Sequence, residues 1–72
     1  MGKSVLYQQI AETIRQQIIE GRLKPDDRLP TVRDMAAKWR CTQGTVQRAY
    51  ADLAREGLLV SRPGQGTRVT ET

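Results

Sequence analysis

Residues 31–57 decide the fold, and they read TVRDMAAKWRCTQGTVQRAYADLAREG. Thr31 and Thr42 each stand directly before apolar residues at helical spacing, and a threonine hydroxyl readily accepts a hydrogen bond from the first turn of a helix. These signals predict one helix over residues 32–39 and another over 43–56, with Gly57 ending the second. The break between them is only a few residues long. Two helices joined in this way are typical of a helix-turn-helix.

The segment before this pair predicts a further helix. Large apolar side chains recur there at every fourth residue, at Leu6, Ile10, Ile14 and Ile18. We expect this helix to span about residues 5–20, with Ser4 as its cap and Gly21 after its last turn. Residues 21–30 are rich in proline and aspartate, which is typical of turns.

The segment after the pair predicts a hairpin. A short apolar run begins at Leu58, and residues 67–70 alternate as a strand does. The five residues Arg62–Gly66 between them include a proline and two glycines and indicate a turn. The expected fold is therefore mainly α with a small β-hairpin. It is a winged helix-turn-helix of three helices plus a two-stranded antiparallel wing at about residues 58–70, packed on the helices.

Composition excludes several classes of function. The chain has 72 residues, no histidine and a single cysteine, so it lacks a nucleophile–base pair and a ligand set for a metal. We expect no enzyme activity, no cofactor and no bound metal. No apolar run is long enough for a membrane span or a secretory signal, which favours a cytoplasmic protein.

The charge balance favours a polyanionic partner. Twelve Lys and Arg oppose eight Asp and Glu, for a net charge of +4, and six of the cations fall within residues 21–40. A basic small domain commonly binds nucleic acid. On charge alone, a basic domain without such a partner fits equally well.

The strongest candidates for a DNA site lie at the start of the third helix. A helix N-terminus presents free backbone N–H groups and the positive end of the helix dipole, and both attract phosphate oxygens. Glutamines four residues apart share a helix face, and glutamine can pair with the adenine edge in the major groove. An ordinary solvated helix surface is the alternative interpretation. The candidates are Thr42, Gln43, Gly44, Thr45, Gln47 and Arg48.

Two other places are candidates for DNA contact. Arg62, Gly64 and Gln65 lie at the narrow tip of the hairpin, which could enter the minor groove, although the glycines also serve a turn with positive φ. Arg33 falls in the first turn of the second helix, where a cation is unfavourable for the helix dipole. That small cost favours a phosphate contact for Arg33.

Several conspicuous residues have structural interpretations instead. Trp39 and Tyr50 stand at core spacing, which leaves Tyr7 as the aromatic residue available for stacking on a base. Cys41 fits a small buried site at the turn better than a redox sensor. The pair Asp26-Asp27 fits a turn better than a metal site, because no third ligand is near.

Short motifs follow one another in order along almost the whole chain. They are Tyr7–Ala11, Ile18–Pro25, Leu29–Ala36, Thr45–Tyr50, Leu53, Glu56–Leu58 and Gly64–Thr67. This ordered set, over about residues 5–69, resembles the GntR family of bacterial transcription regulators, and most of all its YtrA-like or MocR-like branch. The resemblance implies a winged helix-turn-helix that binds double-stranded operator DNA as a homodimer. It also implies DNA contacts from Arg33, from the start of the recognition helix and from Gly64 in the wing.

The chain departs from the family pattern in places. Asp26 stands where the family usually has glycine, so the turn before Leu29 is expected to differ in shape. Gln43 and Gln47 stand where many relatives have arginine, which points towards A·T rather than G·C steps.

Family members also carry a C-terminal effector-binding or dimerisation domain, which the chain lacks. We expect a DNA-binding fragment, with a natural short form as the alternative, and an effector that acts only through the missing domain. Two other functions stay open at this point. One is a protein-interaction module, which should expose an apolar patch, and the other is a non-specific or RNA-binding domain.

Overall fold

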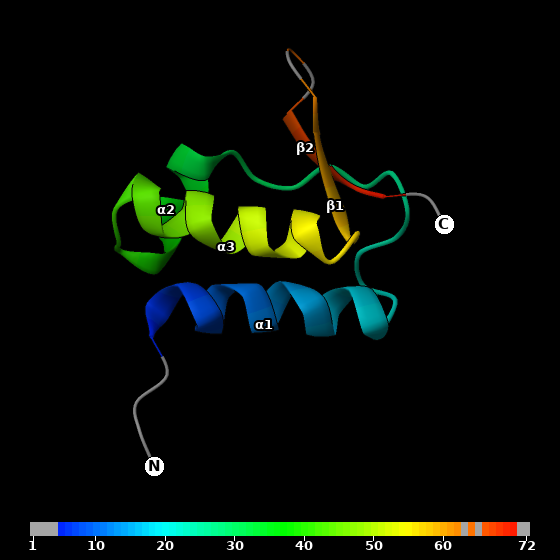
Figure 1. Ribbon diagram of the computed structural model, residues 1–72, viewed down its shortest axis with the longest axis horizontal. Coiled ribbons are helices and arrows are strands. Elements are labelled where there is room, and N and C mark those ends of the chain that lie inside the picture. The colour runs from blue at the N-terminus through cyan, green and yellow to red at the C-terminus, as the bar shows by residue number, and fades with distance from the viewer. Residues whose placement is uncertain (1–4, 63, 65, 71–72) are drawn as a thin grey trace.

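The computed structural model describes residues 5–62, 64 and 66–70 as three helices followed by a two-stranded sheet (Figure 1). The helices are α1 (Leu6–Ile19), α2 (Val32–Trp39) and α3 (Gln43–Arg55), and the strands are β1 (Leu59–Arg62) and β2 (Gly66–Val69). The two strands pair in antiparallel fashion. This arrangement is the expected winged helix-turn-helix, and each helix ends within one residue of its expected bounds.

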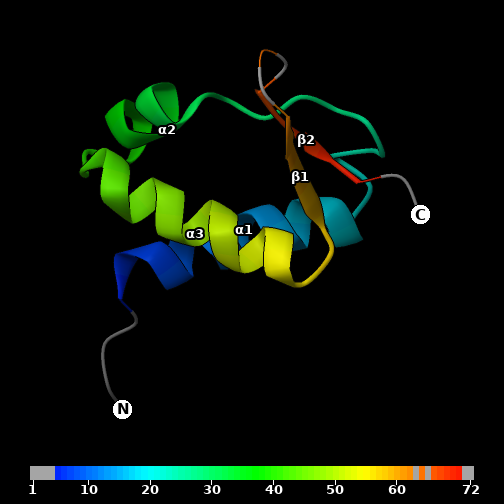
Figure 2. The ribbon, with the colours of Figure 1, turned by 45° about the horizontal axis from the view of Figure 1, so that its top comes forward.

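The core is built around α3. This helix packs against α1, α2 and strand β1 of the wing (Figures 1 and 2). Ile10 of α1 and Val46 and Leu53 of α3 have no exposed surface. Buried side chains from every element surround them: Ala11, Ile14, Leu29, Met35, Ala36, Ala49, Tyr50, Leu59 and Val69. The apolar stripes read from the sequence therefore do face one another.

Most of the expected helix ends are confirmed. The hydroxyl of Thr31 accepts a hydrogen bond from the Asp34 backbone N–H at 3.0 Å, and that of Thr42 accepts one from Thr45 at 3.4 Å. Gly21 and Gly57 follow α1 and α3 with φ of +84° and +85°, the left-handed conformation that glycine adopts without a steric cost.

The expected cap of α1 lies outside the described residues, and the residue after α2 has an unusual backbone conformation. Ser4 lies outside the described residues, and Val5 precedes α1 without a side-chain cap. The helix α2 ends at Trp39, and Arg40 after it takes the left-handed conformation with a φ of 56° although it is not glycine. Cys41 and Trp39 are only half-buried against the core, whereas Tyr50 is buried.

The turn at the tip of the wing is shorter than five residues. Arg62 and Gly66, expected within the turn, are paired with each other as the last rung of the sheet. Each strand therefore reaches one residue further towards the tip than expected, and Pro63 and Gln65 lie outside the described residues. Gly64 and Gly66 both have positive φ, of +76° and +80°, so the turn does need glycine there.

Residues 26–29, expected only to form a turn, instead run alongside β2 as a third, strand-like segment of the wing. The Asp26 N–H donates to the Val69 carbonyl at 2.8 Å, and the Val69 N–H donates to the Asp27 carbonyl at 2.9 Å. The Leu29 N–H donates to the Thr67 carbonyl at 2.9 Å, and Arg28 stands opposite Arg68 as an isolated bridge. The connection between α1 and α2 thus supports β2 along its length, which an isolated hairpin needs.

The two aspartates of this connection have turn roles, as expected. The Asp27 carboxylate accepts a hydrogen bond from the Lys24 N–H at 2.8 Å. Asp26 has a φ of 72°, so it takes the left-handed conformation that a glycine at this place would take. Aspartate tolerates that region better than most residues do. The Asp26 carbonyl oxygen also accepts a hydrogen bond from Nη1 of Arg68 at 3.2 Å.

Tyr50 joins α3 to the segment before α2. Its hydroxyl donates to the Pro30 carbonyl at 2.8 Å, and burial raises the pKa of Tyr50 to about 12. The hydroxyl therefore stays protonated at neutral pH and keeps donating this bond.

None of the helices in residues 5–62 has the length and apolar composition required to cross a lipid bilayer.

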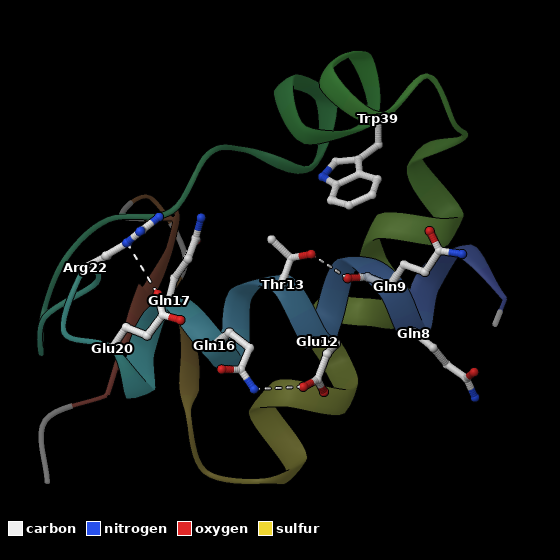
Figure 3. A pocket seen from close by; sticks show the side chains of 9 residues that line it. All are labelled: Gln8, Gln9, Glu12, Thr13, Gln16, Gln17, Glu20, Arg22 and Trp39. Carbon is white, nitrogen blue, oxygen red and sulfur yellow. Dashed lines mark hydrogen bonds and ion pairs between the residues drawn. The ribbon is translucent and has the colours of Figure 1, made fainter.

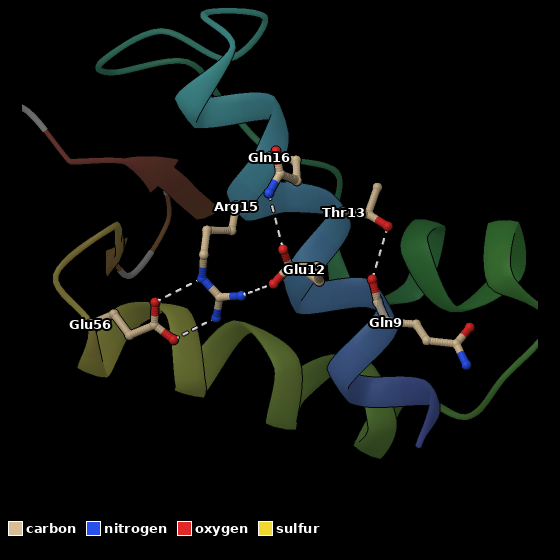
Figure 4. Close-up of polar contacts among 6 residues, drawn as sticks. All are labelled: Gln9, Glu12, Thr13, Arg15, Gln16 and Glu56. Carbon is tan, nitrogen blue, oxygen red and sulfur yellow. Dashed lines mark hydrogen bonds and ion pairs between the residues drawn. The ribbon is translucent and has the colours of Figure 1, made fainter. Parts of the chain in front are cut away.

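An ion-pair network ties α1 to the end of α3 (Figure 4). The Arg15 guanidinium donates twice to the Glu56 carboxylate, at 3.0 and 2.6 Å, and also to Glu12. Hydrogen bonds from Arg15 hold the pKa of Glu56 below its ordinary value of 4.5. The pKa of Glu12 is also lowered, first by a hydrogen bond from Gln16 and then by Arg15.

We expect this network to stabilise the fold in a pH-dependent way. A carboxylate whose pKa is lower in the folded state adds stability that is complete above its ordinary pKa and is lost as the pH falls through the lowered value. The Tm of the wild type should therefore exceed that of Arg15→Met at neutral pH, and the difference should shrink in acid. Thermal melts from neutral pH to about pH 3 measure it. Arg55→Met is the control, and a difference that stays constant with pH would contradict the prediction.

Candidate nucleic-acid interface

The helix α3 divides its residues between the core and an open face. Val46, Ala49, Tyr50 and Leu53 are buried, and each is three or four residues from the next. None of the remaining positions near the start of the helix is buried. Those that are exposed are Thr42, Gln43, Gly44, Gln47 and Arg48, and Thr45 is half-buried. The sequence prediction of an outward polar face is confirmed.

Two threonine hydroxyls stand together at the start of α3. The Oγ1 atoms of Thr42 and Thr45 lie 3.1 Å apart, and Thr42 Oγ1 also accepts from the Thr45 N–H. Either hydroxyl can be the donor in their mutual bond. Two hydroxyl hydrogens are available and one is used, so one O–H stays free to donate to an outside acceptor. Together with the unpaired N–H groups of the first helical turn, it forms a donor group suited to a phosphate oxygen.

Gly44 leaves open space in the first turn of α3. A β-carbon at this position would meet nothing nearer than the Thr42 hydroxyl, at 4.0 Å, and the backbone there does not have a positive φ. Neither packing nor backbone conformation therefore demands glycine. Its absent side chain exposes the helix backbone to any ligand that approaches this end of α3.

Arg48 leans from α3 towards the start of α1. Its guanidinium carbon lies 4.2 Å from the centre of the Tyr7 ring, which is a cation–π contact. Tyr7 is half-buried, so it is not the free stacking aromatic that the sequence suggested. Gln47 and Arg48 diverge from the same helix, because Gln47 lies on the side of the wing and Arg48 on the side of α1.

A groove separates α3 from the wing. It has a volume of about 320 Å³ and lies between Gln47, Ala51 and Ala54 of α3 and the side chains of Ser61 and Thr67 on the wing. Leu59, Tyr50 and Val32 form its floor. The wing therefore stands beside the open face of the helix, so one ligand could contact both (Figure 2).

The other candidate residues lie on the surface but differ in what the structure describes. Arg33, in the first turn of α2, and Arg62, at the end of β1, are exposed, and so is Gly64 in the tip. Gln65 lies outside the described residues. No ion pair engages Arg33 or Arg62 within the described part of the chain.

A larger hollow, of about 700 Å³, lies between α1 and Trp39 at the end of α2 (Figure 3). Amide and hydroxyl side chains of α1 line most of it, and Arg22 pairs there with Glu20 at 3.4 Å. Glu12 adds a second carboxylate. Two carboxylates and one guanidinium do not favour a polyanion, so this hollow is not a candidate for nucleic acid.

The comparisons with known proteins agree with this geometry. Residues 6–69 match the family described as bacterial regulatory proteins, gntR family. The chain belongs to this family. Among curated relatives, the GntR-type chain is 39% identical over 66 residues to YhcF of Bacillus subtilis, an uncharacterized HTH-type transcriptional regulator. It is 36% identical over 66 residues to the transcriptional repressor YtrA of the same organism. Each alignment covers 92% of the chain.

Solved structures show the same GntR winged helix. YtrA from Sulfolobus acidocaldarius, a GntR-family transcription factor, matches with a TM-score of 0.91 and 35% identity over 99% of the chain and 60% of YtrA. The DNA-binding domain of AraR in complex with operator ORR3 matches with a TM-score of 0.85 and 32% identity, over 97% of the chain and 88% of AraR's. The chain is thus a GntR-family DNA-binding domain, and the family's members are regulators rather than enzymes.

The chain spans about half the length of the curated relatives that it matches. It spans 54% of the length of YhcF and 51% of that of YtrA from Bacillus subtilis. Two contacts near the interface were not predicted from the sequence. They are the packing of Arg48 on Tyr7 and the position of Arg28 beside the wing. Both join residues about 40 apart in the chain, and no local pattern indicates such a pair.

Proposed function

We propose that this domain binds operator DNA with the start of α3 in the major groove and the tip of the wing in the minor groove. The observation that carries the proposal is that Gln47, on the exposed face of α3, lines one open groove together with Ser61 and Thr67 of the wing. A two-stranded wing and a recognition helix so placed can contact adjacent grooves of one duplex. The similar AraR domain is crystallised with operator DNA, which supports operator binding by this domain.

The proposed roles follow from the chemistry of each position. The free hydroxyl of the Thr42–Thr45 pair and the N–H groups beside Gly44 bind a phosphate. Gln43 and Gln47 read base edges, and their neutral amides favour adenine over guanine. Arg33 and Arg48 bind backbone phosphates, the latter at the side of α1. Arg62, Gly64 and Gln65 approach the minor groove.

The assembled regulator is proposed to be a homodimer that occludes or bends an operator with two half-sites. A winged helix of this size reads one half-site, so an isolated copy loses the avidity of the dimer and binds weakly. The longer relatives include named repressors, which favours repression as the outcome. A small-molecule effector would act through a part of the regulator outside residues 1–72. The site of action is the bacterial cytoplasm, where the chromosomal DNA lies.

The experiment that tests the proposal is a titration of a short labelled duplex at several salt concentrations. Release of counterions makes log K fall linearly with log salt, with a slope of about −0.9 for each phosphate that the protein neutralises. We expect a clearly negative slope and stronger binding to a duplex selected from a random pool than to unrelated DNA or RNA. A slope near zero, or equal affinity for RNA, would contradict operator binding.

A further inference from the structure

The wing has two faces of different charge. Residues directly opposite in an antiparallel pair share a face, and so do residues two apart in one strand. Ser61, Thr67 and Leu59 line the groove beside α3, so they form the inner face. Arg62 with Gly66, and Val60 with Arg68, consequently lie on the outer face.

Arg28 also lies on this outer face, in the strand-like segment of residues 26–29 beside β2. It stands opposite Arg68 in the bridge between the α1–α2 connection and β2. From there its side chain runs towards the tip. Its Nε and Nη2 lie 3.7 and 3.9 Å from the place where a β-carbon of Gly66 would be. The Arg28 guanidinium therefore lies at van der Waals distance from the side-chain position of Gly66, next to the rung where Arg62 pairs with Gly66.

The two arginines of the bridge, Arg28 and Arg68, differ in whether the chain itself binds their guanidinium groups. Arg68 is half-buried and held by the turn, where its Nη1 lies 3.2 Å from the Asp26 carbonyl oxygen and 3.7 Å from the Asp26 carboxylate. Arg28 is exposed, and within the described part of the chain no ion pair or hydrogen bond engages its guanidinium. A like charge opposite Arg68 destabilises a sheet, so the chain itself gains nothing from a cation at position 28.

We propose that the outer face of the wing is a phosphate-binding surface, in which Arg28 binds a backbone phosphate of the operator beside the tip. The inference rests on the proposed function, since the tip between the two faces has to enter the minor groove. When it does, the outer face meets the sugar–phosphate strand on the side away from α3. Arg28 then makes a contact that is independent of base sequence and that fixes how deeply the wing inserts.

The test compares the charge-removing variant Arg28→Gln with Arg28→Lys and with Arg22→Gln. Arg22 is also exposed and in the same connection, but it lies beside the hollow against α1. Loss of one charged hydrogen-bonding contact should weaken binding about tenfold for every duplex. The slope of log K against log salt should become shallower by about 0.9. Arg28→Lys should keep the slope, and Arg22→Gln should bind as the wild type does.

The other outcomes separate this inference from the proposed function. If Arg33→Ala weakens binding and Arg28→Gln does not, the outer face makes no phosphate contact, while operator binding by the rest of the interface stands. If Arg28→Gln loses affinity with an unchanged salt slope, its role is structural and the inference is wrong. If the wild type itself shows no salt-dependent binding to duplex DNA, both fail. Circular dichroism melts of each variant show whether the fold is intact.

Discussion

Leu53→Ala is expected to lower the free energy of unfolding by about 3 kcal/mol, the largest effect on stability that we predict. Leu53 has no exposed surface and belongs to the core cluster. Alanine removes buried methyl groups and leaves a cavity in this core. A domain of this size has only about 5–10 kcal/mol in total, so this loss brings it close to unfolding.

Thermal and urea unfolding followed by circular dichroism measure the effect. For a domain of this length, a loss of about 3 kcal/mol lowers the Tm by roughly 12–24 °C. Leu58→Ala is the matched control, because Leu58 is a half-buried leucine near the same end of α3. Its Tm should fall much less. Equal losses for the two variants would show that α3 is not the centre of the core.

Arg33→Ala and Gln47→Ala are expected to impair DNA binding in different ways, and these are the largest effects on function that we predict. Arg33 contacts a phosphate in the proposed interface, so its loss should weaken binding to all sequences about equally and reduce the salt slope by about 1. Gln47 reads a base edge, so its loss should remove about 1–3 kcal/mol of discrimination at one base pair while affinity for unrelated DNA stays similar.

A panel of duplexes with single base-pair changes, built on a sequence selected from a random pool by a forced dimer, separates the two effects. Both residues are exposed, and neither side chain belongs to the core, so both variants should keep the Tm of the wild type. Arg55→Ala, which removes an exposed arginine at the end of α3, serves as the control for loss of charge. Uniform weakening by Gln47→Ala would rule out base reading by that residue.

The helices and their caps could be predicted because their determinants are local. Thr31 and Thr42 each bind an N–H only three residues away, and the apolar positions of α1 and α3 repeat within a few turns. Hydrophobic spacing also identified most of the core, since a stripe on a helix has to be covered by another element. The open face of α3, with Gln43, Gly44 and Gln47, follows by elimination from the same stripe.

The connection between α1 and α2 was predicted only in part. Proline and aspartate indicated turns, and Asp26 and Asp27 do form them. The hydrogen bonds that place residues 26–29 alongside the wing join them to residues 67–69, about 40 positions away. No repeat or capping pattern records such a pairing. The same distance in sequence hides the cation–π contact between Arg48 and Tyr7.

By itself, the sequence determined the three helices, the hairpin, the buried stripe of α3 and the polar residues that stripe leaves outside, because each depends on side chains within one or two turns of each other. Only the tertiary structure decided how the wing is supported, which of its faces carries charge, and where Arg28 and Arg48 lie. Those features depend on backbone pairing and packing between segments far apart in the chain, and such contacts exist only once the core has brought the segments together.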